Sequence, residues 1–195
     1  MSSDSESILK TVLNHVQVPC IIDADGLNLL AAHPDWMEQL KDGDYILTPH
    51  MKELSRLTGH SIEELKKDRK KAMCEFTELY QTTLVQKDAR TLVGGCKKTI
   101  YVNRTGNAAM AKAGSGDVLA GIITALRAQE LSAYDAAVLG VYLHGLAGDA
   151  ARDELGRYSV LARDLVEHIA SGIRRIENEG KNNKDETIYQ GLCQN

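Results

Sequence analysis

Cysteine, aromatic residues and long apolar runs are all scarce in this sequence. Only 4 of the 195 residues are cysteine, and none forms a C-x-x-C pair with another. This argues against a zinc site and against a disulfide framework, and it favours a reducing compartment. No apolar run approaches the length of a membrane span. We therefore expect a soluble, cytoplasmic protein without a membrane partner.

Concentrated positive charge is also missing. The net charge is −4 and no basic stripe with interleaved aromatic residues is present, so we expect no nucleic-acid partner. The one basic run, residues 66–71, lies in a helical stretch and is expected to be a solvated helix face. Residues 1–7 are acidic and show neither an apolar core nor an arginine-rich amphipathic pattern, which predicts no secretory signal and no transit peptide.

Short apolar runs alternate with helical patterns over residues 1–176, which we expect to form one domain, followed by a charged tail over 177–195. The runs predict buried parallel strands at 19–22, 45–47 and 83–87, and a short antiparallel pair at 91–93 and 99–102. Helices are expected over 7–16, 27–31, 35–41, 51–57, 61–80, 118–126, 133–153 and 161–176. This order predicts an α/β fold with a mainly parallel central sheet flanked by helices.

A glycine-rich loop precedes one of these helices and ends in Gly114, Ser115, Gly116 and Asp117. Backbone N–H groups at the start of a helix bind phosphate or a developing anion, helped by the helix dipole. Asp117 at the mouth of such a loop is well placed to accept a hydroxyl proton. The alternative is an ordinary glycine turn followed by an acidic first-turn residue.

Polar side chains follow the predicted parallel strands: Asp23 and Asp25, His50 and Lys87. Ligand sites of parallel α/β sheets lie beyond the carboxyl ends of the strands, so we expect these residues and Asp117 to converge. Structural alternatives remain for each: the two aspartates as helix caps, His50 as a helix N-cap, and Lys87 as a surface lysine. We interpret His144 and Asp149, on the helix predicted over 133–153, as satisfied core or helix-end residues.

Four ordered motifs carry a resemblance to a known family: residues 22–30 (IDADGLNLL), 47–50 (LTPH), 105–117 (TGNAAMAKAGSGD) and 136–149 (AAVLGVYLHGLAGD). They resemble the signatures of the ADP/ATP-dependent NAD(P)H-hydrate dehydratases, metabolite-repair enzymes of the ribokinase-like superfamily. The resemblance runs from about Val18 to Ile169 and implies a three-layer ribokinase-like fold.

The resemblance also implies a reaction and its residues. Hydrated NADH or NADPH would be phosphorylated on its ring hydroxyl by ADP or ATP, with Mg²⁺, and phosphate elimination would restore the dihydropyridine. Asp117 matches the catalytic aspartate, the N–H groups of residues 114–116 match the anion hole, and His50 matches a substrate-contacting histidine, with Asp117 also in contact with the substrate. The matching nucleotide-binding residues are Lys87, Asp88, Ala89, Arg90, Thr91 and Gly116. We expect supporting contacts from Asp23, Asp25, Asn28 and Asn107, and we assign no metal ligand.

The family pattern includes a glycine-rich βαβ portion before the Asp-Ala-Asp strand, so the resemblance implies an N-terminally shortened fold. The sheet edge and helix faces left uncovered indicate a truncated isoform, a partner that supplies the rest, or a fold adapted by oligomerising, and we expect a homo-oligomer. Asp88 and Lys112 stand where the family has glycine and threonine, each adding a charge near the nucleotide. Two alternatives therefore stay open: a small-molecule kinase of the same superfamily, and a catalytically impaired nucleotide-binding or regulatory protein.

Overall fold

The structure, a computed structural model, describes residues 3–182. These residues fall into two compact units, the first comprising 3–104 and 119–142 and the second comprising 105–118 and 143–182.

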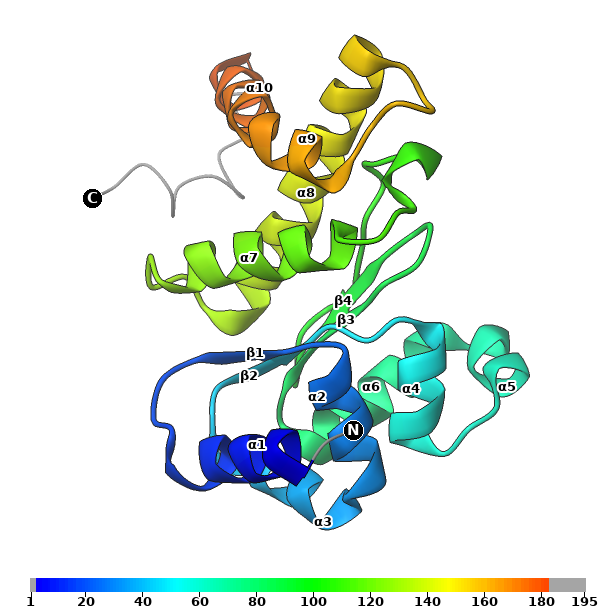
Figure 1. Cartoon of the computed structure of the whole chain (residues 1–195), viewed down its shortest axis with the longest axis vertical. Coiled ribbons are helices and arrows are strands. Elements are labelled where there is room, and N and C mark those ends of the chain that lie inside the picture. Colours follow the sequence, from blue (N-terminus) through cyan, green and yellow to red (C-terminus); the bar gives the residue numbers. More distant parts are fainter. Residues whose placement is uncertain (1–2, 183–195) are drawn as a thin grey trace. The chain divides into compact units, whose positions relative to one another are not determined.

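The first unit is built on a five-stranded sheet with the strand order β1-β2-β3-β4-β5 (Figure 1). The strands are β1 (Cys20–Ile22), β2 (Tyr45–Leu47), β3 (Thr83–Gln86), β4 (Leu92–Gly94) and β5 (Tyr101–Val102). The first three pair in parallel, with Ile21 opposite Ile46 and Leu47 opposite Leu84. The last two pairings are antiparallel. The sheet is therefore mixed, and both the parallel strands and the antiparallel pair predicted from the sequence are confirmed.

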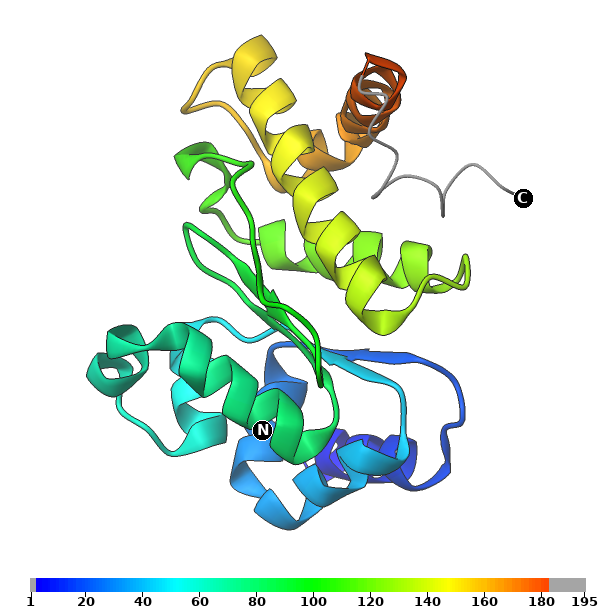
Figure 2. The same cartoon turned by 180° about the vertical axis from the view of Figure 1, so that it is seen from behind.

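Helices cover both faces of this sheet because its central strands are apolar on both sides. On one face Leu47 and Leu84 join a core formed with the helices before β3 (Figure 1). These elements are α1 (Ser3–His15), α2 (Asp25–Ala32), α3 (Pro34–Met37), the 3₁₀ helix η1 (Glu38–Asp42), α4 (Met51–Thr58), α5 (Ile62–Lys67) and α6 (Arg69–Tyr80). Of these, α6 lies beside β3 and β4 (Figure 2).

The opposite face of the sheet is formed by the alternate residues Ile46, Val85 and Val93. They pack against Ile123 of α7 (Ser115–Arg127) and Ala137 of α8 (Ala133–Leu155). Neighbouring residues of one strand thus enter different cores, as expected for strands buried on both faces. The predicted three-layer α/β arrangement is confirmed in this unit.

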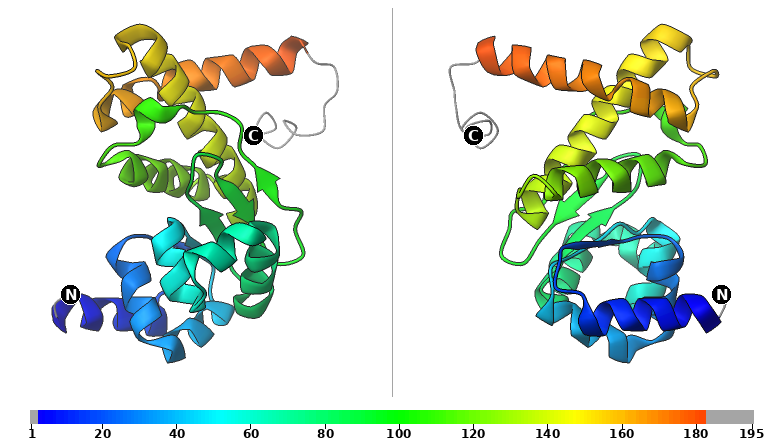
Figure 3. Two further views of the ribbon diagram at one scale, coloured as in Figure 1. Left: turned by 90° about the vertical axis from the view of Figure 1, so that its right-hand side faces the viewer. Right: turned by 60° about the vertical axis from the view of Figure 1, so that its left-hand side comes forward.

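The second unit contains the glycine-rich loop with the short 3₁₀ helix η2 (Ala108–Met110), the carboxyl-terminal part of α8, and the helices α9 (Ala162–Glu167) and α10 (Ile169–Asn182). Its small core joins Ala109, Ala151, Val160 and Leu165. Gly172 lets α10 cross closely over Leu143 and Leu146 of α8 (Figure 3). None of the helices in the described part of the chain combines the length and the apolarity that crossing a membrane requires.

Two helices predicted as continuous are interrupted. The helix predicted over 61–80 breaks at Asp68, whose backbone leaves the helical region and whose carboxylate accepts a hydrogen bond from the Lys71 N–H, so that a new helix begins there. The helix predicted over 161–176 breaks at His168, and its second part continues to Asn182. The predicted division at 176 stays a prediction, and residues 183–195 lie outside the described residues.

Candidate functional site

Three predicted site residues lie together at the carboxyl ends of the parallel strands in the first unit. Asp23 follows β1, His50 follows β2, and Lys87 follows β3. His50 and Lys87 form an isolated parallel bridge, and the Lys87 N–H donates to the Pro49 carbonyl oxygen at 2.8 Å. The Lys87 ammonium donates to Asp23 Oδ1 at 2.6 Å. We call these three residues the strand-end cluster. Their part of the predicted convergence is confirmed, whereas the convergence of Asp117, which belongs to the second unit, with them stays a prediction.

Asp23 pairs with Lys87 rather than capping the helix that follows it. The two side chains are 16% and 22% exposed, so the ion pair is largely shielded from solvent. The N-cap of α2 is Ala24, and it makes no side-chain capping bond. Ala24 has φ 48° and ψ −115°, a conformation that side-chain-bearing residues rarely adopt. The alternative in which Asp23 serves as a cap is therefore wrong, and Asp25 lies exposed in the first turn of α2.

His50 is the N-cap of α4, so the structural alternative for it is confirmed. Its Nδ1 accepts a hydrogen bond from the Glu53 N–H at 3.0 Å, and the Glu53 carboxylate accepts one from the His50 N–H at 2.8 Å. A neutral imidazole that accepts at Nδ1 carries its proton on Nε2. The His50 side chain is 49% exposed. Its Nε2 lies 3.5 Å from Glu53 Oε1, so the capping arrangement holds both ring nitrogens near Glu53 at the ends of the strands.

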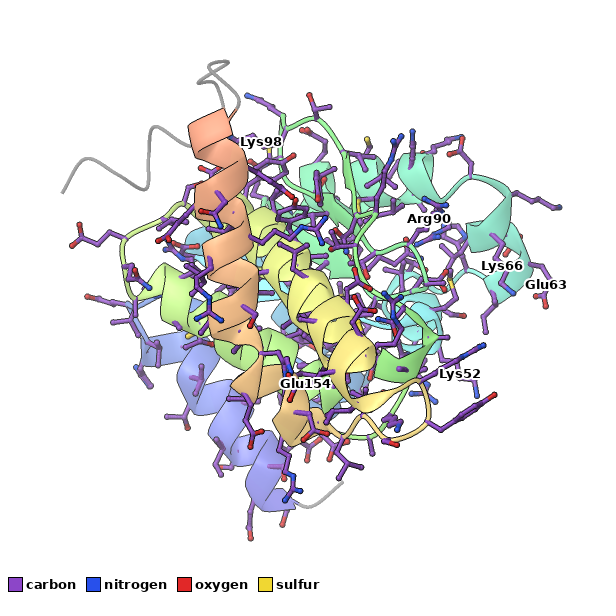
Figure 4. All side chains as sticks on the ribbon, turned by 90° about the horizontal axis from the view of Figure 1, so that it is seen from above. Lys52, Glu63, Lys66, Arg90, Lys98 and Glu154 are labelled. Carbon is purple, nitrogen blue, oxygen red and sulfur yellow. The ribbon has the colours of Figure 1, made fainter. Side chains whose placement is uncertain are left out.

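Residues 87–91, the predicted nucleotide-binding segment, form a turn held by Arg69. The Arg69 guanidinium lies 3.2 Å from the Asp88 carboxylate and donates to the Arg90 carbonyl oxygen at 3.0 Å. Thr91 closes the turn by donating its hydroxyl to the Asp88 carbonyl oxygen at 3.1 Å. The Arg69 guanidinium therefore balances the negative charge that Asp88 adds to the family pattern. The Arg90 side chain itself is exposed (Figure 4).

Asn28, one of the predicted supporting residues, contacts a neighbouring helix. Its side-chain oxygen accepts a hydrogen bond from Arg56 Nη1 of α4 at 2.7 Å. This bond joins α2 to α4 in the first unit, and it leaves the supporting role of Asn28 a prediction.

The glycine loop of the second unit presents unpaired N–H groups at the start of α7. Gly114 has φ +86°, and its carbonyl oxygen accepts the Val118 N–H at 3.1 Å. The Ser115 N–H donates to the Lys112 carbonyl oxygen at 3.3 Å, whereas within the described residues the N–H groups of Gly116 and Asp117 have no acceptor. Two such donors at the N-terminus of a 13-residue helix suit an anion. The Asp117 carboxylate is exposed on the same turn.

Lys112, the second charged departure from the family pattern, is turned away from this helix start. Its ammonium donates to the carbonyl oxygens of Tyr158 and Val160 in the segment between α8 and α9. The Lys112 side chain therefore links two loops. Its ammonium group binds these carbonyl oxygens, so the N–H groups are the donors in the first turn of α7.

His144 lies on α8 beside the predicted anion hole. Its Nε2 is 3.3 Å from the hydroxyl oxygen of Ser115, which is buried. Burial lowers the pKa of His144 to about 4, against an opposing hydrogen bond to Ser115. The imidazole is therefore neutral at pH 7, and it fills the space behind Ser115 without adding charge there.

The depressed pKa of His144 predicts a loss of stability in acid. A base whose folded pKa lies below its unfolded value contributes stability that is fully present above pH 6.5 and is lost as the pH falls to about 4. The shift corresponds to about 3 kcal/mol at most. We expect the free energy of unfolding of the His144→Gln variant, measured by urea titration, to change less over this range than that of the parent protein.

His15→Gln, at an exposed position of α1, is the control and should follow the parent protein. The pKa of His168 shifts in the opposite direction. Its hydrogen bond to the Asp164 carbonyl oxygen raises this pKa, and Glu154, labelled in Figure 4, raises it further. His168 is present in all three proteins and cancels from the comparison. Equal pH dependence in the parent protein and in His144→Gln would contradict the assignment.

Asp149 is the residue whose surroundings the sequence did not indicate. It is satisfied, as expected, but its partners lie in the glycine loop: its carboxylate accepts from the Gly106 N–H at 3.0 Å and from Asn107 Nδ2 at 2.8 Å. Its spacing from Gly145 and Gly148, on one face of α8, is the only sequence signal that could have indicated it.

Comparison with known proteins identifies relatives over most of the chain. A family model described as NAD(P)H-hydrate dehydratase matches residues 2–171. A bifunctional NAD(P)H-hydrate repair enzyme of Moorella thermoacetica is 40% identical over 175 residues, covering 88% of this chain and 32% of that protein. An ADP-dependent (S)-NAD(P)H-hydrate dehydratase of Neisseria meningitidis is 39% identical over 166 residues, covering 84% of this chain and 55% of that protein.

A solved structure supports the same relationship. The ADP/ATP-dependent NAD(P)H-hydrate dehydratase of Bacillus subtilis, co-crystallised with ATP and Mg²⁺, aligns with a TM-score of 0.76 at 29% identity, covering 89% of this chain and 60% of that one. The predicted ribokinase-like fold is thereby confirmed. The chain spans about a third to just over half of the length of these curated relatives. On this evidence the chain belongs to the NAD(P)H-hydrate dehydratase family.

Proposed function

We propose that this protein is a nucleotide-dependent dehydratase that repairs hydrated NADH and NADPH. The ring hydroxyl of the hydrate attacks the terminal phosphoryl group of ADP or ATP and loses its proton. The resulting phosphate ester then expels inorganic phosphate, and loss of a ring proton restores the double bond of the dihydropyridine. The products are the reduced coenzyme, inorganic phosphate and the nucleotide shortened by one phosphate.

The observation that carries this proposal is the first turn of α7. Its two unpaired N–H groups, of Gly116 and Asp117, suit the negative charge of a transferring phosphoryl group. The exposed Asp117 carboxylate on the same turn is an oxygen base for the hydroxyl proton. We assign Asp117 as the base and the N–H groups of residues 114–116 as the anion hole, in which the Ser115 N–H would exchange the Lys112 carbonyl oxygen for the phosphoryl group.

Residues of the first unit are proposed to bind the two substrates. The turn at 87–91 would hold the adenine nucleotide, with the ammonium of Lys87 supplying positive charge. The Nε2–H donor of His50 would contact the hydrated nicotinamide. Asp23 would hold Lys87 in place, whereas Asp25, Asn28 and Asn107 would act in support.

Mg²⁺ is proposed to enter with the nucleotide. It binds through substrate phosphates, water and one or two carboxylates more often than through a protein cage. No group of three or more His, Cys, Asp or Glu side chains in the described part of the chain is placed to hold a metal, and we assign no residue as its ligand. Its chemistry would be to neutralise charge on the phosphates. Assembly as a homo-oligomer and a cytoplasmic location are part of the same proposal.

The test is recovery of the absorbance of reduced nicotinamide. Purified protein is mixed with hydrated NADH or NADPH, Mg²⁺, and either ADP or ATP. We expect recovery that needs both protein and nucleotide, and the effective nucleotide identifies the donor. Absence of recovery with either donor, together with measurable nucleotide binding, would contradict the proposal and favour a binding or regulatory protein. Phosphorylation of an added small alcohol in place of the hydrate would favour the kinase alternative.

A further inference from the structure

We infer that Asp149 is a positioning residue that sets the shape of the phosphate-binding loop. The inference rests on the proposed function in one respect, since it takes the loop that leads to Gly114–Asp117 to bind the nucleotide phosphates.

Each oxygen of the Asp149 carboxylate has a partner at the start of the loop. Oδ2 accepts from the Gly106 N–H at 3.0 Å, and Oδ1 accepts from Asn107 Nδ2 at 2.8 Å. The Asp149 side chain is 22% exposed, so these bonds are partly protected from competing water. Hydrogen bonds to a charged acceptor are stronger than those between neutral groups. One side chain thereby fixes a backbone group and a side chain of adjacent loop residues.

Asn107 transmits this restraint along the loop. Its side-chain oxygen accepts the Ala109 N–H at 2.9 Å and thus caps η2, while its Nδ2 also donates to the Gly148 carbonyl oxygen at 2.9 Å. The Asn107 side chain can make all these hydrogen bonds only with its oxygen toward Ala109 and its nitrogen toward Asp149. The Asp149 carboxylate favours this orientation of the amide, because a carboxylate accepts hydrogen bonds and cannot donate them.

The face of α8 that carries Asp149 is shaped to receive the loop. A Cβ at Gly145 would lie 2.7 Å from the Thr105 backbone carbon, and one at Gly148 would lie 2.2 Å from the Met110 sulfur. Residues 145, 148 and 149 lie on one helix face because they are three and four positions apart. The loop therefore rests on helix backbone, and Asp149 is the charged group that holds it there.

The experiment compares Asp149→Asn with Asp153→Asn. The first substitution replaces one acceptor oxygen with a donor that faces the Gly106 N–H or the Asn107 amide. The second removes the same charge from an exposed residue of α8 that contacts no loop residue but shares Arg152 with Asp149, since Arg152 Nη2 lies 2.7 Å from Asp153 Oδ1 and Arg152 Nη1 lies 3.6 Å from Asp149 Oδ1. ADP and ATP affinities are measured by calorimetric titration, and amide hydrogen exchange is followed over residues 105–118.

We expect Asp149→Asn to weaken nucleotide binding by about tenfold and to speed exchange over 105–118, while Asp153→Asn matches the parent protein. The double variant Asn107→Asp/Asp149→Asn again pairs a carboxylate with an amide between positions 107 and 149, although a carboxylate at 107 cannot donate to the Gly148 carbonyl oxygen as Asn107 does. It should recover part of the affinity, which a purely structural loss would not do. A raised KM for the nucleotide and an unchanged KM for the hydrate in Asp149→Asn would support the same role of Asp149.

The outcomes separate this inference from the proposed function. A protein that binds nucleotide without repairing the hydrate would contradict the dehydratase, while the affinities and exchange rates would still decide the role of Asp149. If no nucleotide bound to the parent protein, the exchange rates over 105–118 alone would decide it. Parent-like affinity and exchange in Asp149→Asn would overturn the inference.

Discussion

Asp117→Asn is expected to lower the turnover of hydrated NADH by about a hundredfold or more while nucleotide affinity is retained. The substitution keeps the size of the side chain and its place in the first turn of α7, but an amide cannot accept the hydroxyl proton. The unpaired N–H groups of this turn do not depend on the carboxylate, so the anion site should persist. Steady-state absorbance kinetics and nucleotide titration measure the two quantities.

Asp135→Asn is a matched control for this experiment. Asp135 is also an acidic residue in the first turn of a helix, α8, where its carboxylate accepts a hydrogen bond from the Ser132 hydroxyl. Its loss should affect stability by about 1 kcal/mol at most and leave turnover unchanged. Full turnover in Asp117→Asn would rule out its role as the base. Loss of nucleotide binding would show that the carboxylate serves the site structurally.

Gly114→Ala is expected to weaken nucleotide binding by about tenfold or more and to destabilise the protein by about 1–3 kcal/mol. Gly114 has φ +86°, in the left-handed region, and an added Cβ would lie 2.9 Å from the Ala162 Cβ at the start of α9. Relief of that contact would shift the backbone immediately before the N–H groups of Ser115 and Gly116. Thermal unfolding and nucleotide titration provide the two readouts.

Gly121→Ala offers the opposite expectation on the same helix. A Cβ at Gly121 meets nothing within 4 Å, and the residue lies in the middle of α7. Alanine there should stabilise the protein by about 0.5–1 kcal/mol and leave nucleotide binding unchanged. Equal effects of the two substitutions on nucleotide affinity would refute the assignment of the loop at Gly114.

In the strand-end cluster, a structural role of a side chain is compatible with the proposed functional one. His50 caps α4, as the structural alternative proposed, and the same capping bond fixes the proton of the imidazole on Nε2. The Asp23 carboxylate is not a helix cap, because it pairs with the Lys87 ammonium. A lysine held by a buried partner loses less side-chain entropy on meeting a phosphate than a free surface lysine would.

Local patterns in the sequence were sufficient for the framework of the first unit. Apolar runs such as Tyr45–Leu47 predicted strands buried on both faces, because neighbouring side chains of a strand point to opposite sides. The glycine loop before α7 and the Ser61–Glu64 capping box were recognised for the same reason: each depends on residues a few positions apart. The sequence patterns did not predict the helix breaks at Asp68 and His168, because both residues also fit a helical pattern.

The sequence by itself determined the α/β order of elements, the position of the glycine loop before α7 and the family to which the chain belongs. Only the tertiary structure decided the partners of the charged groups. Asp23 meets Lys87 across 64 positions and Asp149 meets Asn107 across 42, and no periodicity spans such separations. Buried carboxylates need partners wherever the fold supplies them, so their roles emerge only once distant segments have been brought together.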